Sequence, residues 1–128
     1  MKINPNLICV GEVGWTIPSL TSSTTFNQQT IELSTDDYDM VEVIYIDYCG
    51  TQRYHSVRVP KGNPINLNSL FDANQGKMYM GVRTIYITDD THFWVNDCYS
   101  CITGTAFNVA VSNQWCIPTK IILWKNNV

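Results

Sequence analysis

Residues 40–48 alternate in a way that predicts a β-strand with two largely apolar faces. Successive side chains of a strand point to opposite sides of the sheet, so Val43 and Tyr45 would share one face. Ile44 and Ile46 would share the other. An antiparallel sheet with one solvated face normally alternates between apolar and polar residues. The pattern therefore predicts that something other than water covers each face of this strand.

Similar alternation predicts strands along most of the chain. Gly50 and Thr51 favour a hairpin after the strand at 40–48, and Asp89 with Asp90 favours a later turn. Pro60 ends one strand, because proline cannot donate a hydrogen bond within a sheet. Further strands are predicted over residues 24–34, 51–60, 78–88, 92–103, 106–113 and 117–125.

Two segments lack a clear strand pattern. Residues 1–20 are predicted to be an N-terminal lead or linker, and residues 61–77 a long polar connection punctuated by Gly, Pro and Asn. Within that connection, residues 68–71 could form a single helical turn. No segment has the periodicity of an amphipathic helix, so the chain is expected to be built from strands alone.

About seven or eight strands, spaced by roughly 10–15 residues, predict an all-β antiparallel sandwich or barrel. In a sandwich the partner sheet covers one face of the 40–48 strand. Self-association would cover the other face, because large exposed apolar patches usually mark interfaces. The alternative is that the 61–77 connection folds over that face. The predicted oligomer interface consists of Val43, Ile44, Tyr45 and Ile46.

The composition fits one β-rich domain. The chain has 128 residues, of which 45% are hydrophobic and 15% charged, and this suits a single domain over residues 1–128. Its net charge is −3 and lysine and arginine form no cluster, which argues against nucleic acid as a partner. No apolar run approaches the roughly 18 residues of a membrane span, so membrane insertion is not expected.

The five cysteines are expected to be reduced structural thiols, because their number is odd and their density is too low for a disulfide scaffold. Cys98 and Cys101 have the C-x-x-C spacing of zinc and redox sites. A zinc site needs two more ligands, and a thioredoxin-like site needs a helix that the sequence does not predict. We therefore expect no metal and no cofactor. The other residues that could converge with this pair are Cys49, Cys116, His55 and His92.

Candidate catalytic groups have little pattern. Glycoside hydrolysis needs two carboxyl groups about 5–10 Å apart across a sugar, whereas Asp36 with Asp37 and Asp89 with Asp90 are neighbours that suit turns better. A Ser-His-Asp set can be assembled from distant residues, but no G-x-S-x-G nucleophile elbow is present. We therefore expect a protein that is not an enzyme. The residues available for such a set are Ser56 or Ser100, His55 or His92, and Asp97.

The stretch "THFWVNDCYS" predicts a glycan-binding surface, because His92, Trp94 and Asn96 would share one face of a strand. The C–H faces of a sugar stack on an indole ring, while its hydroxyl groups bond to amide and imidazole groups. The alternative is that Trp94 fills the core. Further candidates for glycan contact are Trp115, Arg53 and His55.

The layout of these strands resembles the C-terminal receptor-binding domains of bacteriophage tail fibres and baseplate tip proteins. The segments that carry the resemblance, over roughly residues 20 to 125, are "TSSTTFNQQTIELS", "DYDMVEVIYIDY", "HSVRVP" and "KIILWK". The resemblance implies a jelly-roll-like β-sandwich that forms a homotrimer and binds a glycan of the host surface. It carries over no binding residues, and the repetitive shaft of such fibres has no counterpart in this sequence.

These observations predict a non-enzymatic phage or prophage protein, made in the bacterial host cytoplasm and located in the virion. Its expected partners are copies of itself, other virion tail proteins and a bacterial cell-surface polysaccharide. One alternative is a structural capsid or tail decoration protein without a ligand site. A small glycan-processing enzyme is the other.

Overall fold

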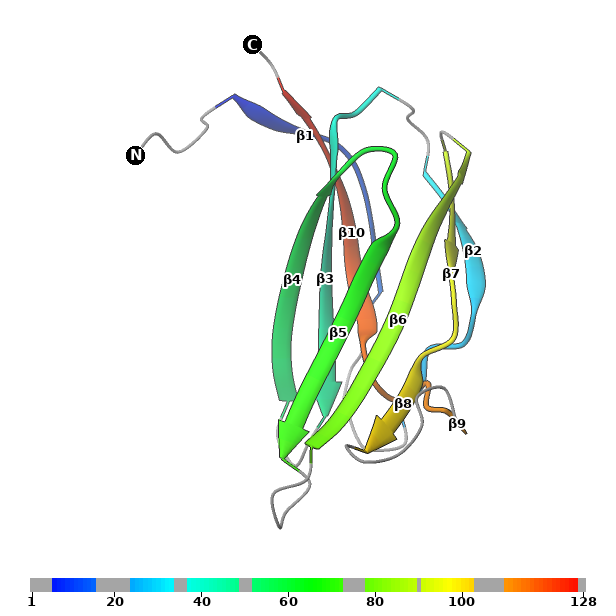
Figure 1. Cartoon of the computed structure of the whole chain (residues 1–128). Helices are drawn as coiled ribbons and strands as arrows, with labels where there is room; N and C mark the ends of the chain where they lie inside the picture. Colours follow the sequence, from blue (N-terminus) through cyan, green and yellow to red (C-terminus); the bar gives the residue numbers. More distant parts are fainter. Residues whose placement is uncertain are drawn as a thin grey trace.

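The computed structural model describes residues 6–15, 24–33, 37–48, 52–72, 78–89, 91–102 and 110–126. Every regular element within these ranges is a strand, and the strands form two antiparallel sheets that face each other (Figure 1). The prediction of an all-β antiparallel sandwich is therefore confirmed.

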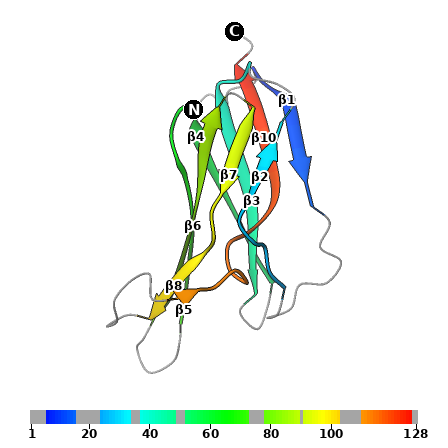
Figure 2. The ribbon, with the colours of Figure 1, turned by 90° about the vertical axis from the view of Figure 1, so that its right-hand side faces the viewer.

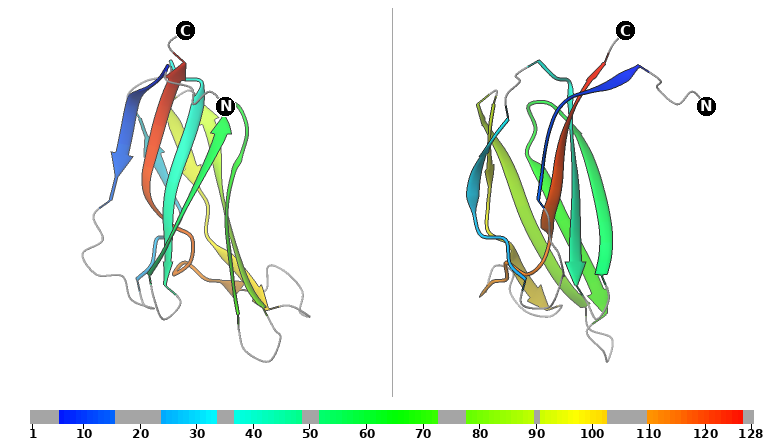
Figure 3. Two further views of the ribbon diagram at one scale, coloured as in Figure 1. Left: turned by 90° about the vertical axis from the view of Figure 1, so that its left-hand side faces the viewer. Right: turned by 180° about the vertical axis from the view of Figure 1, so that it is seen from behind.

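The first sheet has the order β1-β10-β3-β4, and the second has the order β2-β7-β6-β8-β9 with β5 paired to β6. Figure 2 looks onto the outer side of the second sheet, and the left view of Figure 3 looks onto that of the first. The strands are β1 (Leu7–Gly14), β2 (Gln29–Glu32), β3 (Met40–Tyr48), β4 (Gln52–Pro60), β5 (Ile65–Asp72), β6 (Met78–Asp89), β7 (His92–Val95), β8 (Tyr99–Ile102), β9 (Ala110–Val111) and β10 (Ile117–Asn126).

Strand β3 lies in the middle of the first sheet, between β10 and β4. Val43 is fully buried and Tyr45 is 6% exposed, and both belong to the core between the sheets. Ile44 and Ile46 belong to the outer face, opposite Ser56 and Tyr54 of β4. Ile46 is nonetheless only 3% exposed and belongs to the core cluster, so of the four predicted interface residues only Ile44 is partly exposed to another subunit.

The core is built from the inward-pointing residues of both sheets, as the alternation of apolar residues requires. Burying this apolar surface between the two sheets is the main source of stability. The fully buried aliphatic and aromatic members include Val41, Val43, Ile65, Leu67, Ile85, Phe93, Val95, Ile121 and Leu123.

Strand β5 corrects the prediction for the 61–77 connection. Residues 65–72 pair with β6 along their whole length, so the helical turn proposed for residues 68–71 does not form. Ile65, Leu67 and Ser69 point inward and are nearly fully buried. Because this segment belongs to the second sheet, it cannot serve as a cover for the outer face of β3.

Strand β1 corrects the prediction of a lead or linker over residues 1–20. Residues 7–14 pair with β10 and form one edge of the first sheet, with a bulge between Cys9 and Gly11. The bulge interrupts the period of two, and the alternation is therefore hard to recognise in the sequence. Residues 1–5 and 16–20 lie outside the described part of the chain.

The strand predicted over residues 92–103 is divided in two. Both β7 and β8 pair with the same strand, β6, but at different heights. Between them the carbonyl of Asn96 accepts a hydrogen bond from Nη1 of buried Arg83, at 2.8 Å. The Asn96 carbonyl therefore bonds to a side chain rather than to a backbone N–H of β6, although the Asn96 N–H still donates to Thr84 O. Of the strand predicted at 106–113, the structure describes only residues 110–113, which include β9.

Candidate functional site

Two aromatic side chains are neighbours on the outer face of the second sheet. Trp94 of β7 lies directly opposite Tyr86 of β6 on one side and Thr30 of β2 on the other. Side chains that face each other across antiparallel strands have Cβ atoms about 4.5–5.5 Å apart. Tyr86 is 44% exposed and Trp94 is half-buried. We call Thr30, Trp94 and Tyr86 the aromatic row.

A second row, which we call the acidic row, consists of Glu32, His92 and Asp89. His92 Nδ1 lies 2.7 Å from Asp89 Oδ1, and His92 Nε2 lies 3.7 Å from Glu32 Oε2. The Asp89 carboxylate also accepts hydrogen bonds from the backbone N–H groups of Thr91 and His92, which forms the turn between β6 and β7. The acidic row is thus held in place by the turn that the sequence predicted.

The contact between Asp89 and His92 shifts the pKa values of the two groups in opposite directions. The hydrogen bond with Asp89 raises the pKa of His92, and the hydrogen bond with His92 lowers the pKa of Asp89. The contribution of His92 is complete below its usual pKa of about 6.5 and is lost as pH rises through the raised value. That of Asp89 is complete above about 3.9 and is lost as pH falls through the lowered value. The Asp89–His92 pair therefore stabilises the turn most between about pH 3.9 and about pH 6.5.

A third row, which we call the amide row, lies on the other side of the aromatic row. It contains Asn96, Thr84 and Asn66: Asn96 N donates to Thr84 O at 3.0 Å, and Thr84 Oγ1 donates to Asn66 Oδ1 at 3.0 Å. From His92 to Trp94 the rows are two residues apart, which corresponds to about 7 Å. On β6 a bulge places Asp89 three residues after Tyr86.

The structure therefore places two of the predicted glycan-contact residues, His92 and Trp94, on the outer face of β7. Asn96 follows directly after this strand, where its N–H donates to Thr84 O and its Oδ1 accepts from Asp97 N. The neighbours Tyr86 and Thr30 were missed, because they come from other strands and are found only once the register of β6, β7 and β2 is known. Alternation within "RTIYIT" predicts which face Tyr86 occupies, but not which residue it faces.

Trp115 belongs to the core rather than to a binding surface. It is only 9% exposed, and its ring packs against that of Tyr79 with centroids 5.5 Å apart. A Cβ atom placed on Gly81 would come within 2.6 Å of the indole ring. The ring therefore fills a space that only glycine leaves open, and it is not presented to a ligand.

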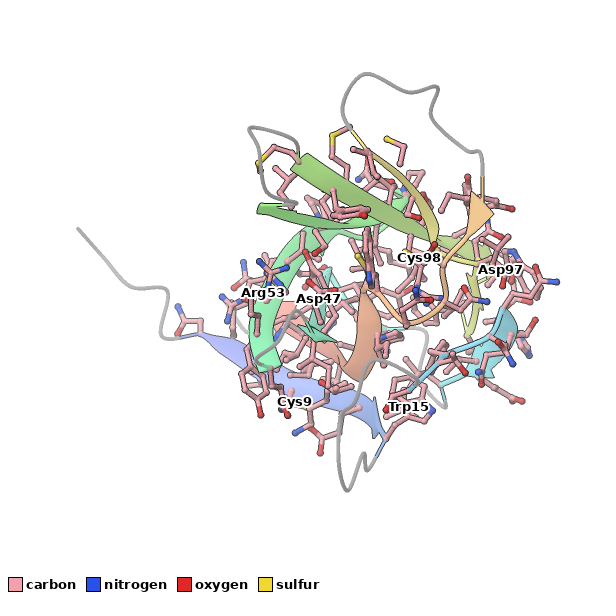
Figure 4. The ribbon with its side chains drawn as sticks, turned by 90° about the horizontal axis from the view of Figure 1, so that it is seen from below. Cys9, Trp15, Asp47, Arg53, Asp97 and Cys98 are labelled. Carbon is pink, nitrogen blue, oxygen red and sulfur yellow. The ribbon has the colours of Figure 1, made fainter. Side chains whose placement is uncertain are left out.

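Arg53 and His55 surround a buried carboxylate. Asp47 is fully buried, and its Oδ2 lies 2.7 Å from His55 Nε2 and accepts a hydrogen bond from Ser69 Oγ at 2.6 Å. Oδ1 accepts a hydrogen bond from the backbone N–H of Cys116 at 2.7 Å. Arg53 lies beside Asp47 (Figure 4). These side chains join β3, β4 and β5 at one end of the sandwich.

The order of groups around Asp47 differs from that of a hydrolytic triad. In a triad the histidine lies between the serine and the aspartate, whereas here the aspartate lies between Ser69 and His55. Asp97, another candidate for such a set, accepts hydrogen bonds from Asn113 Nδ2 at 2.8 Å and from the backbone of Gln28 at 3.2 Å. Both carboxylates therefore have structural contacts that account for their positions.

Cys98 interacts with Cys116, and this interaction lowers the pKa of the Cys98 thiol and, together with burial, raises that of Cys116. The Cys116 thiol itself donates to the carbonyl oxygens of Leu67 and Gly81. Cys98, Cys101 and Cys116 are buried free thiols, and Cys9 is exposed. Cys49 lies outside the described residues. In the part of the chain that the structure describes, no three histidine, cysteine or acidic side chains are grouped so that they could hold a metal.

No protein-family model, curated protein or solved structure matches this chain. Within the described ranges, no helix is long and apolar enough to cross a membrane. The candidate function therefore depends on the geometry of the three rows and on the resemblance found in the sequence.

Proposed function

We propose that this chain is a non-enzymatic receptor-binding protein of a phage or prophage virion, and that it recognises a bacterial surface glycan. The observation that carries the proposal is the pair of exposed Tyr86 and half-buried Trp94, flanked by the acidic row and the amide row. Aromatic faces stack on the C–H faces of sugars, and planar polar groups bond to hydroxyl groups. The three rows supply both kinds of contact on one open surface.

The path of the chain supports a jelly-roll-like form of the sandwich. It passes from the first sheet to the second between β1 and β2 and returns before β3. It crosses again between β4 and β5, and returns between β9 and β10. Repeated exchange between two antiparallel sheets is the kind of connection that jelly rolls use.

The protein acts as a homotrimer in this proposal, with the outer face of the first sheet as the interface. Ile44 lies at the centre of that face, between β4 and β10, and the neighbouring Tyr54 is 70% exposed. A site on an open sheet binds one sugar chain weakly. Several copies on one particle raise the overall avidity by orders of magnitude.

The trimer can be tested by light scattering. The wild-type mass is expected near three times 14.6 kDa at micromolar concentration. Ile44→Asp should give a monomer, because a carboxylate buried at the interface loses its hydration, and the facing Lys120 is already paired with Glu12 at 3.3 Å. The matched control is Leu70→Asp, which changes a 55% exposed leucine on the outer face of the second sheet. If only Leu70→Asp dissociated the trimer, the interface would lie on the second sheet and the proposed location would be wrong. A monomeric wild type would refute self-association.

The glycan site can be tested with Trp94→Ala. We expect attachment to glycans to fall at least about tenfold, because aromatic anchors contribute a large share of binding free energy. The melting temperature should change little, since the ring is partly exposed on an outer face. Binding to an array of bacterial surface polysaccharides and a thermal melt measure the two effects.

Trp124→Ala is the matched control for this variant. Trp124 is also half-buried, but it lies on the outer face of the first sheet, where its indole N–H donates to Glu42 at 2.8 Å. We expect this variant to keep its binding per subunit, measured with a monovalent oligosaccharide, because Trp124 lies on the proposed trimer interface and its loss could change only the avidity. Equal loss of binding in both variants, or normal binding by folded Trp94→Ala protein, would contradict the proposed site.

A further inference from the structure

The outer face of the second sheet carries no lysine or arginine among its described residues. The outward positions hold polar, aromatic and aliphatic side chains, and the charged groups whose side chains the structure describes there are Glu32, Asp89 and His92. Arg83, the one described arginine in this sheet, points inward and is fully buried. Outward positions of the sheet, other than the acidic row, include Thr30, Asn66, Asn68, Leu70, Met78, Met80, Val82, Thr84, Tyr86, Trp94, Tyr99 and Val111.

The described cations lie elsewhere and face other groups. Arg58 pairs with Glu42 at 3.3 Å, and Lys120 pairs with Glu12 at 3.3 Å, both on the first sheet. The remaining contacts are those of Arg53 with Asp47, Lys125 with Asp37, and Lys61 with the ring of Tyr38. A ligand on the three rows would therefore meet none of these positive charges directly.

The charge beside the aromatic row is negative. The acidic row contains two carboxylates and one imidazole. The side chain of Glu32 is 73% exposed and that of Asp89 is 60% exposed. The acidic row lies about 7 Å from the aromatic row, which is within the screening length of about 8 Å at physiological salt. An acidic substituent on a sugar stacked at Trp94 would be repelled, and among the described residues it would find no arginine or lysine on this face to bond.

We infer that the three rows select glycans whose repeating units are uncharged or carry a free amine, and that they reject glycans carrying uronate, phosphate or sulfate groups. This inference rests on the proposed function and adds the chemical class of the ligand. Hydroxyl and amide substituents bond to the amide row, and an ammonium group is attracted by Glu32 and Asp89.

An array of purified bacterial capsular polysaccharides and O-antigens, sorted by the charge of their repeating units, tests the inference. Wild-type protein should bind neutral or amine-bearing members, and Trp94→Ala should lose those signals. Binding to a uronate- or phosphate-bearing polysaccharide that depends on Trp94 would overturn the inference while leaving the proposed function intact. Absence of binding to every member would instead count against the proposed function, and the inference would fall with it.

Charge reversal supplies the second arm. Glu32→Lys should add acidic polysaccharides to the bound set, with a gain of at least about tenfold over the wild type. Glu12→Lys makes the same change in net charge on the opposite sheet, where Glu12 is also exposed, and it should leave the pattern unchanged. An equal gain in both variants would show that net charge, rather than the acidic row, decides selection, and would overturn the inference.

Discussion

Arg83→Met is expected to lower the free energy of unfolding by about 3 kcal/mol or more, because each buried carbonyl left without a donor costs about 1–3 kcal/mol. The Arg83 guanidinium is fully buried and has no carboxylate partner among its hydrogen bonds. It donates to the carbonyl oxygens of Cys116 at 2.9 Å, Asn96 at 2.8 Å and Trp115 at 3.1 Å. Methionine keeps much of the volume but donates to none of them.

Urea denaturation measures this loss. Arg58→Met is the matched control, because the Arg58 side chain is 52% exposed and its pair with Glu42 is expected to contribute at most about 1 kcal/mol. Arg83→Lys should also be destabilised, because a single ammonium group cannot donate to all the carbonyl oxygens that surround the planar guanidinium. Wild-type stability in Arg83→Met would show that these carbonyls find other donors.

Asp47→Ala is expected to cost about 3–5 kcal/mol, the range found when one partner of a buried charged network is removed. The change leaves the hydroxyl of Ser69, the backbone N–H of Cys116 and the side chain of His55 without their shared acceptor. It also removes one of the hydrogen bonds that join β3 to β5, while that of Tyr45 with Asn68 remains. The melting temperature and the urea midpoint should both fall.

Asp37→Ala is the matched control for Asp47→Ala. Asp37 is exposed and pairs with Lys125 at the surface, where water screens the charges. Little change in the melting temperature is expected. Asp47→Asn should lie between the two, because an amide oxygen can still accept one of the hydrogen bonds. A melt for Asp47→Ala that matches Asp37→Ala would mean that the buried network contributes nothing net to folding.

The strands with regular alternation were predictable from the sequence. β3, β4, β6 and β10 each begin and end within about one residue of the predicted bounds. β1 was missed because its bulge breaks the period of two. β5 was missed because its outward asparagines and inward Ser69 make a buried strand look like a polar loop. In both cases pairing with a neighbouring strand, which the local sequence does not encode, decides the structure.

The candidate site was predictable only in part. One strand supplied His92 and Trp94, because alternation alone assigns them to one face. Tyr86 and Thr30 required the register of three strands. Trp115 could not be placed from sequence, since its polar neighbours suggest a surface loop.

The position of Trp115 follows from long-range contacts. Its carbonyl oxygen bonds to Arg83, and its ring occupies the space that Gly81 leaves open. Arg53 and His55 are likewise positioned by Asp47. The sequence shows Asp47 only as an acidic residue in a largely apolar strand and does not reveal its partners. Such contacts across the core are set by tertiary packing.

The most direct test of glycan binding by the second sheet is an NMR titration with the oligosaccharide that gives the strongest array signal. The amide and side-chain signals of the aromatic row and its two flanking rows should shift together and saturate, while those of Ile44 and Arg58 on the first sheet stay unchanged. Shifts that instead centre on the first sheet, or on Arg53 and His55, would contradict the account.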